Sequence, residues 1–171
     1  MKNKIILIIS LVFFTISTAL TAQVKIKLGH INTNELMVSM PGRDTAQKVL
    51  EEYAKDLESQ LTLMSQEFQT KYQDYLSNEA SYLEPIKQSK QKELVDLEQR
   101  INDFKTQAQE MLSQKEAELI KPLIDRAKKA IDDVAIEKGY TYILDTGTGA
   151  VIYFPETDNV MSFVKEKLGI K

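Results

Sequence analysis

The sequence predicts an α+β protein that is mostly helical, in which a long helical hairpin projects from a small body that contains β-strands. Three observations support this fold class. Between Gly42 and Gly139 the chain has no glycine and two prolines, and it is rich in Glu, Gln, Lys, Leu and Ala, a composition typical of long helices. Apolar residues recur in that segment at steps of three and four. Short β-rich runs precede and follow it.

The first 22 residues have the pattern of a secretory signal peptide. Lys2 and Lys4 precede an apolar run from Ile5 to Leu20, and the small residues Thr21 and Ala22 follow. The run falls short of the roughly 20 apolar residues that a membrane-spanning helix needs. We therefore expect residues 1–22 to be cleaved on export, so that the mature chain begins near residue 23.

The chain has no cysteine and an acidic balance. Its 171 residues include 22 basic and 25 acidic side chains, and loss of Lys2 and Lys4 with the signal peptide leaves 20 against 25, a net charge of −5. Without cysteine there is no disulfide, no thiolate metal site and no lipid-modified N-terminal cysteine. The acidic charge argues against nucleic acid as a partner.

Two segments, 23–42 and 119–171, are expected to form the body. The run "VKIKLGHI" (24–31) alternates like a half-buried strand, and Asn32 with Glu35 predicts a capping box for a short helix that Pro41 and Gly42 end. After Gly139, "YTYILD" and "VIYF" predict two strands joined as a hairpin by "TGTGA". A last amphipathic helix is expected from about Asp158 to Leu168.

Residues 43–118 are expected to form the arm, with a tip near 77–85. Asp44 with Gln47 predicts the start of the ascending helix, and Pro85 suits the first position of the returning helix. At 1.5 Å per residue, the ascending helix would extend ~60 Å. The apolar stripe of the two helices consists of Leu50, Tyr53, Leu57, Leu61, Met64, Phe68, Tyr72, Tyr75 and Tyr82, then Leu94, Leu97, Ile101, Phe104, Ala108 and Met111.

Pro122 is the candidate hinge of the arm. It lies where the apolar stripe widens past Glu118 and the returning helix enters the body. Proline removes one intrahelical hydrogen bond, so a kink is expected there.

A thin arm and three short strands bury little apolar surface in one chain, so we expect the strands to join those of sister chains. The oligomerisation candidates are Ile26, Leu28, Ile143 and Ile152.

The triplet Asp145-Thr146-Gly147 matches the catalytic triplet of aspartic proteases. Such enzymes bring two carboxylates together within a mostly β-sheet wall, which this largely helical chain does not offer, so a hairpin turn is the favoured interpretation. His30 is the single histidine, so a histidine zinc cluster is excluded. No P-loop, nucleophile elbow or dinucleotide fingerprint occurs. We expect no enzyme activity and no catalytic, cofactor-binding or metal-binding residues.

The remaining candidates for function are aromatic and methionine side chains toward the tip of the arm. Two interpretations remain open, namely that they hold the hairpin together or that they stay partly exposed and make adaptable contacts with apolar partners. The client-contacting candidates are Met64, Phe68, Tyr72, Tyr75 and Tyr82.

The order of these parts resembles the Skp/OmpH-like periplasmic chaperone family over essentially the whole mature chain. The resemblance is carried by "KIKLGHINTNELMVSMP", the Gln/Glu/Lys-rich hairpin, and most specifically by "IKPLIDRAKKAIDDVAIEKGYTYILD". It implies a jellyfish-like homotrimer in the periplasm that holds unfolded outer-membrane β-barrel proteins between its arms without ATP or any cofactor. Well-known members are basic whereas this chain is acidic, so the charge does not support a lipid or lipopolysaccharide site.

Two other classes of function stay open. One is a structural or adaptor coiled coil of the cell envelope that docks a single folded partner, and the other is an envelope-associated lipid binder. A chaperone would suppress aggregation of several unrelated unfolded barrels, whereas an adaptor would bind one partner tightly and protect none.

Overall fold

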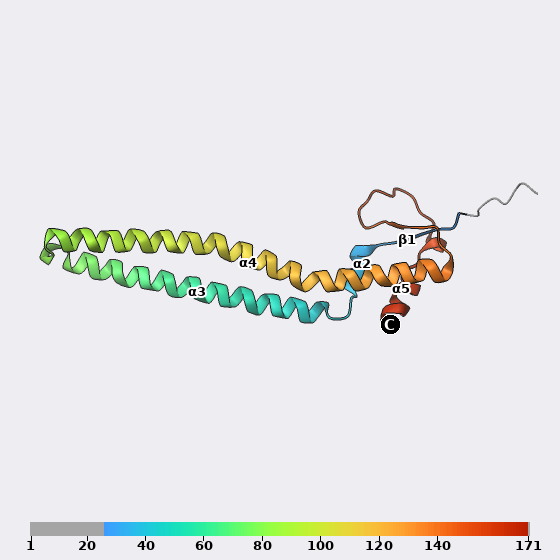
Figure 1. The fold of residues 1–171 in the computed structure, drawn as a ribbon, viewed down its shortest axis with the longest axis horizontal. Coiled ribbons are helices and arrows are strands. Elements are labelled where there is room, and N and C mark those ends of the chain that lie inside the picture. Colours follow the sequence, from blue (N-terminus) through green and yellow to red (C-terminus); the bar gives the residue numbers. More distant parts are fainter. Residues whose placement is uncertain (1–25, 171) are drawn as a thin grey trace, which may run out of the picture.

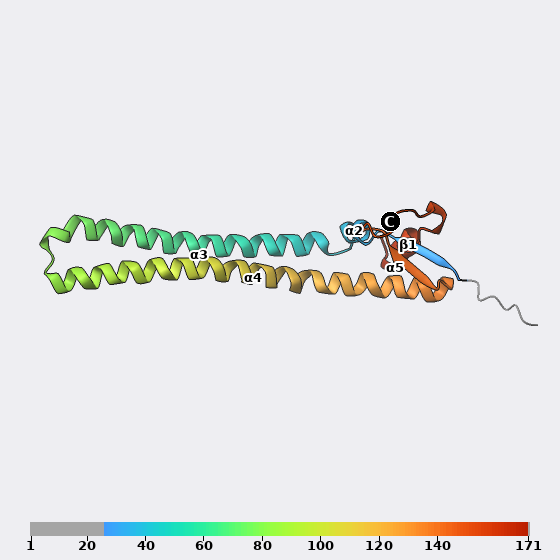
Figure 2. The same cartoon turned by 90° about the horizontal axis from the view of Figure 1, so that it is seen from above.

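The computed structural model describes residues 26–170 as a long two-helix arm with a small head at one end (Figures 1 and 2). The prediction of a mostly helical chain with a small β-containing body is confirmed, although two strands form within these residues in place of the three that were predicted. The signal peptide predicted at 1–22, and the start of the first predicted strand, lie outside the described residues. The elements in order are β1 (Leu28–Ile31), α2 (Thr33–Val38), α3 (Arg43–Asn78), the 3₁₀ turn η1 (Glu79–Ser81), α4 (Glu84–Lys138), β2 (Tyr142–Asp145), the 3₁₀ turn η2 (Glu156–Asp158) and α5 (Met161–Leu168).

The arm is built by α3, of 36 residues, packed antiparallel against the first half of α4, of 55 residues (Figure 2). A 36-residue helix is ~54 Å long. The predicted cap at Asp44 is wrong. Gly42 occupies the N-cap position with φ 94, a left-handed conformation that favours glycine, and Asp44 lies within the first turn. There its carboxylate interacts favourably with the positive end of the helix dipole.

The tip of the arm is held by a tyrosine pair. Tyr75 is buried, its hydroxyl donates to Glu79 at 3.0 Å, and it accepts a hydrogen bond from the amide of Gln91 on the returning helix at 2.8 Å. The Tyr82 ring lies 6.2 Å from the Tyr75 ring. Pro85 sits in the first turn of α4, where its missing N–H costs no helical hydrogen bond.

The strands of the head pair differently from the prediction. β2 pairs with β1 in parallel, Leu28 opposite Tyr142 and His30 opposite Leu144, so the predicted hairpin between β2 and residues 151–154 is wrong. Past Asp145 the chain turns away, because the Asp145 carboxylate accepts the N–H of Gly147 at 2.8 Å and closes a local turn. Residues 151–154 lie in the loop seen beside β1 in Figure 1.

This loop returns the chain to the other side of β1. His30 forms an isolated parallel bridge with Asn159, and the Val160 N–H donates to the His30 carbonyl at 2.9 Å. The last helix then begins at Met161, three residues after the predicted start at Asp158. The Asn159 side chain accepts the Met161 N–H at 2.9 Å, which satisfies one of the unpaired donors at the start of the helix.

The core lies in the head, between the second half of α4, the short helices and the inner side of β1. α4 contributes Leu123, Ala127, Ala130 and Val134 at steps of four, three and four, which places them on one face. α4 continues through Pro122 without ending, and Figure 1 shows it bending between arm and head. The other buried core residues are Ile31, Leu36, Met40, Ala46, Val160, Met161 and Val164.

Candidate functional site

Asp145, the carboxylate of the protease-like triplet, connects two segments of the head. Its side chain accepts the hydroxyl of Thr33 at 2.6 Å, the backbone N–H of Thr33 at 3.2 Å and the N–H of Gly147 at 2.8 Å. Burial acts to raise the pKa of Asp145, but the hydrogen bonds from Thr33 and Gly147 outweigh it and hold the pKa below its ordinary value. The carboxylate therefore anchors the start of α2 to the end of β2.

The His30 side chain also makes its contacts within the head. Its side chain is buried, its Nε2 lies 2.9 Å from the Pro155 carbonyl, and its ring centroid lies 4.5 Å from that of Phe154, with the two rings tilted by 48°. These contacts hold the base of the 146–155 loop against β1. In residues 26–170, no three His, Asp or Glu side chains gather where they could bind a metal ion.

The five client-contacting candidates fall into two groups along the arm. Tyr75 is 6% exposed, and Tyr82 is half-buried against it with its hydroxyl 3.4 Å from Asp74, so both are engaged in closing the tip. Nearer the head, Phe68 and Tyr72 stack with ring centroids 6.0 Å apart, and Tyr72 is 42% exposed. Met64 is half-buried one turn further down. The structure thus offers Met64, Phe68 and Tyr72 at the margin of the helix pair.

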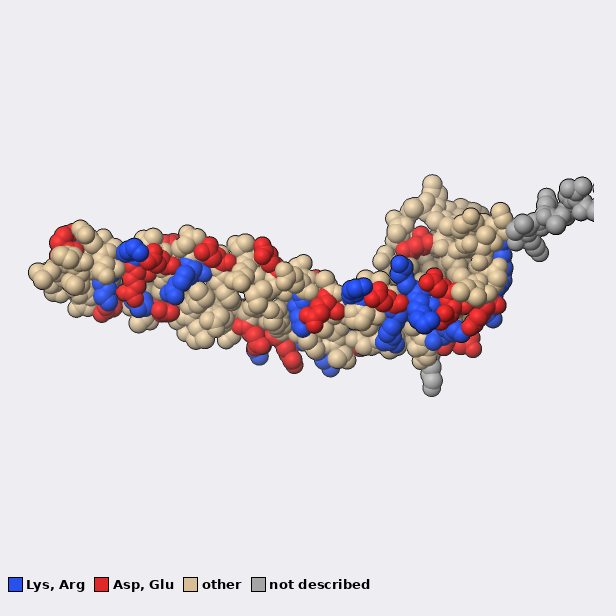
Figure 3. Space-filling model, viewed as in Figure 1, with Lys and Arg blue, Asp and Glu red and all other residues tan. Residues whose placement is uncertain are grey.

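One side of the arm carries a cluster of ion pairs. Lys71 on α3 contacts Glu93 on α4 at 2.5 Å, with Glu67 at 3.9 Å from Lys71 and Lys90 at 3.8 Å from Glu93. The hydrogen bond and charge of Lys71 lower the pKa of Glu93, and Glu93 raises the pKa of Lys71. We call Glu67, Lys71, Lys90 and Glu93 the charged edge. Figure 3 shows charged side chains of both signs near the outer end of the arm and again near the head.

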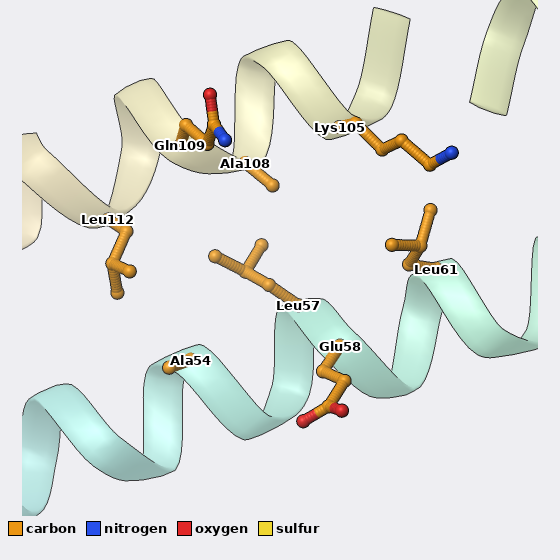
Figure 4. A pocket seen from close by; sticks show the side chains of 8 residues that line it. All are labelled: Ala54, Leu57, Glu58, Leu61, Lys105, Ala108, Gln109 and Leu112. Carbon is orange, nitrogen blue, oxygen red and sulfur yellow. The ribbon is translucent and has the colours of Figure 1, made fainter. Parts of the chain in front are cut away.

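Between the helices, in the half of the arm nearer the head, lies a cavity of about 330 Å³ that we call the arm groove. Figure 4 shows Leu57 and Leu112 projecting into the space between α3 and α4, while the carboxylate of Glu58 and the amide of Gln109 point away from it. The sequence prediction missed this groove, although Ala54 and Ala108 mark it as small residues among large ones. Its lining is Ala54, Leu57, Glu58, Leu61, Lys105, Ala108, Gln109 and Leu112.

The head presents an apolar surface that its own chain leaves open. The Leu28 side chain is 48% exposed, and that of Tyr142, its neighbour on the adjacent strand, is 60% exposed. Leu144 is also exposed and lies on the same side of the sheet, because alternate residues of a strand point the same way. We call these three residues the open sheet face. Ile152, in the loop beside it, is 97% exposed. Sequence reasoning missed Tyr142 and Leu144.

Of the predicted oligomerisation residues, three are exposed and one is not. Ile26, Leu28 and Ile152 face solvent in the single chain. Ile143 packs instead against the core of its own head, because it points to the opposite side of β2 from Tyr142 and Leu144. None of the helices within residues 26–170 combines the length and the apolar character needed to cross a lipid bilayer.

Comparison with known proteins connects this architecture to a family. The chain shares its fold with an OmpH-like protein from Caulobacter crescentus CB15, described as a candidate outer membrane chaperone, with a TM-score of 0.73 and 10% sequence identity over 84% of this chain and 83% of that one. The curated proteins yield no match. The family model for outer membrane proteins of the OmpH-like type matches residues 27–168, which include the arm and the head. The chain therefore belongs to the OmpH-like family.

Proposed function

We propose that this protein is an ATP-independent periplasmic holdase that binds unfolded outer-membrane proteins between helical arms and keeps them from aggregating. The observation that carries the proposal is an arm that projects from its head and has aliphatic and aromatic side chains along its margin. Membership of the OmpH-like family, and a shared fold with a protein described as a candidate outer membrane chaperone, support it.

The proposed assembly is a homotrimer formed through the head, residues 23–42 and 119–171. Apolar side chains of the open sheet face, together with Ile26 and Ile152, would be covered by sister chains. A two-stranded sheet is marginal by itself, and its exposed edge favours addition of further strands. Three arms, residues 43–118 of each chain, would then surround a common space, and removal of residues 1–22 on export would place the assembly in the periplasm.

Release without ATP requires many weak contacts in place of a few strong ones. The margin of the arm suits that requirement, because Met64, Phe68 and Tyr72 are partly accessible and offer adaptable apolar contact. Tyr75 and Tyr82 would act chiefly in shaping the tip, since they contact each other and Tyr75 is buried.

A coiled-coil adaptor that docks one folded partner is the competing function. The charged edge favours it, because ion pairs such as Lys71 with Glu93 give a surface with a fixed pattern of positive and negative charge, and complementary charge gives specificity for one partner. The two functions differ in selectivity, since a holdase protects unrelated unfolded barrels and an adaptor protects none.

The test is native mass measurement of the mature protein, alone and after mixing with a urea-unfolded outer-membrane β-barrel, together with light scattering during dilution of the barrel from urea. We expect a trimer, a complex of one barrel chain per trimer, and suppressed scattering for at least two barrels of unrelated sequence. A monomer at micromolar concentration that leaves scattering unchanged would refute the proposal.

A further inference from the structure

The two edges of the arm differ in charge. From this difference we infer that the arm groove is a binding subsite for apolar side chains of an extended, unfolded polypeptide. The side-chain amides beside the groove would form hydrogen bonds with the backbone of that polypeptide. This inference rests on the proposed function and specifies which edge of the arm meets the client.

The groove has an aliphatic floor that its own chain leaves unfilled. Leu57 of α3 lies across from Ala108 of α4, and the small Ala108 side chain leaves room where a larger residue would close the helix pair (Figure 4). On either side of this pair, Leu112 lies across from Ala54 and Leu61 across from Lys105. The polar groups of Glu58 and Gln109 point away from the gap in that view. A space of about 330 Å³ accepts a large aliphatic or aromatic side chain, whose burial is favourable.

Uncharged polar side chains continue the groove toward the tip. An adjoining space of about 450 Å³ shares Glu58 and Leu61 with it and is lined further by Thr62, Ser65, Gln66 and Gln69, which we call the amide edge. Primary amides carry both donors and acceptors. They can therefore pair with the backbone N–H and C=O groups of a segment that has not yet formed its sheet.

The charged edge lies on the other side of the arm. Each helical residue advances by about 100°, so residues two apart point roughly 160° away from each other. Gln69 and Lys71 are two apart, as are Ser65 and Glu67. The ion pairs thus occupy the edge of the arm opposite the amide edge. Desolvating that charged edge against an apolar segment would be costly. The groove is lined by two charged residues, Glu58 and Lys105, and otherwise by aliphatic side chains and an amide, which cost far less to desolvate.

The spacing of the groove fits an extended chain. Same-side residues of an extended chain recur every two residues, about 6.6 Å apart. Leu57 and Leu61 are four residues apart on a helix, which is about 6 Å along its axis. Strands of outer-membrane barrels alternate apolar and polar side chains. A segment with this alternation could lay successive apolar side chains over Leu57 and Leu61, so the occupant that we propose is an extended segment of an unfolded outer-membrane barrel.

The experiment fills the groove and compares the result with a matched substitution outside it. Ala108→Leu inserts a side chain into the groove, and Ala117→Leu makes the same change at an exposed position of the same helix that does not line it. The probe is a fluorescent, urea-unfolded outer-membrane β-barrel diluted into buffer with each variant. Loss of one buried side chain from the subsite should weaken binding by about five- to tenfold for Ala108→Leu and leave Ala117→Leu unchanged.

A photo-crosslinker gives a second readout that does not depend on packing. Benzoylphenylalanine in place of Gln109, at the groove, should crosslink to the barrel, and in place of Gln107, two residues away and on the opposite side, should not. Equal binding of both leucine variants with equal crosslinking at both positions would overturn the subsite while the holdase function stands. Crosslinking from position 109 to another copy of this chain would also overturn it. A wild-type protein that fails to bind the barrel would remove the subsite and the proposed function together.

Discussion

At the scale of the residue, the Asp145 carboxylate shows how a motif associated with catalysis can serve as a joint. Asp145 accepts hydrogen bonds from Thr33 at the start of α2 and from Gly147 in the turn after β2. Gly147 has to be small, because a Cβ there would lie 2.7 Å from the Asn32 Oδ1 and 3.1 Å from the Asp145 carboxylate. The triplet is therefore explained by the joining of two distant segments.

We predict that Asp145→Ala destabilises the head by about 2 kcal/mol at neutral pH, since it leaves charge-assisted hydrogen-bond donors of Thr33 and Gly147 unpaired. The pKa of Asp145 is lowered in the folded chain from about 3.9 when unfolded, so the unfolded chain binds more protons in acid. Its stabilisation is fully present above that unfolded pKa and is lost as pH falls through the lower folded pKa. Urea unfolding at pH 7 and near pH 3 measures both effects.

A control for this prediction is Asp125→Ala, which removes an exposed carboxylate paired with Lys121 on the surface of α4. Exposed ion pairs contribute little, so its unfolding free energy should change by less than about 0.5 kcal/mol. If both variants show the same stability and the same dependence on pH, the Asp145 carboxylate does not stabilise the contact between β2 and the start of α2.

At the scale of the element, the long helices could be predicted from the sequence and their ends only in part. Helix composition and the three- and four-residue steps of the apolar stripe are local features of the sequence, so α3 and α4 could be predicted from them. The start at Gly42 was missed because the helix begins there without a side-chain cap, at a glycine in the left-handed conformation, whereas the prediction relied on a capping side chain at Asp44. The β2 pairing was missed because "YILD", "TGTGA" and "VIYF" satisfy the local rules of a hairpin, whereas the observed partner, β1, is more than 100 residues away.

The bend of α4 at the junction of arm and head leads to a second prediction. Pro122→Ala restores an N–H that can donate to the carbonyl of Glu118, so the helix should stiffen where the arm leaves the head. We expect the mass of the assembly to stay the same and the range of arm spreads to narrow. Because the chain has no cysteine, Ser81→Cys places a single spin label at each tip, and distance distributions between labels, with small-angle scattering, measure the spread.

Lys121→Ala serves as the control for the hinge, since it changes the neighbouring residue without altering the backbone hydrogen bonds. Its distance distribution should match that of the wild-type protein. A Pro122→Ala distribution as broad as the wild type would show that the flexibility of the arm, if present, arises elsewhere.

At the scale of the whole molecule, the head of a single chain leaves apolar surface uncovered. Its core is filled by α4, α2 and α5 on the inner side of β1, while the open sheet face and, in the loop, Ile152 and Tyr153 are left exposed. The sequence indicated that the strands were too few, but could not tell which side they would expose. Ile143 was therefore grouped with Leu28 although the two lie on opposite sides of the sheet.

The open sheet face leads to the last prediction. Leu28→Glu places a carboxylate in the centre of the surface that sister chains are proposed to cover, opposite Tyr142 and flanked by Ile26. Burying an unpaired charge there would cost several kcal/mol per chain, enough to dissociate the assembly at micromolar concentration. Leu63→Glu adds the same charge at a similarly exposed position, 57% against 48%, but on the arm, and should leave the mass unchanged.

Light scattering coupled to gel filtration, with circular dichroism to confirm retained helix, separates dissociation from unfolding. Equal masses for the two variants would mean that the open sheet face takes no part in assembly, and that the arms are brought together by another surface.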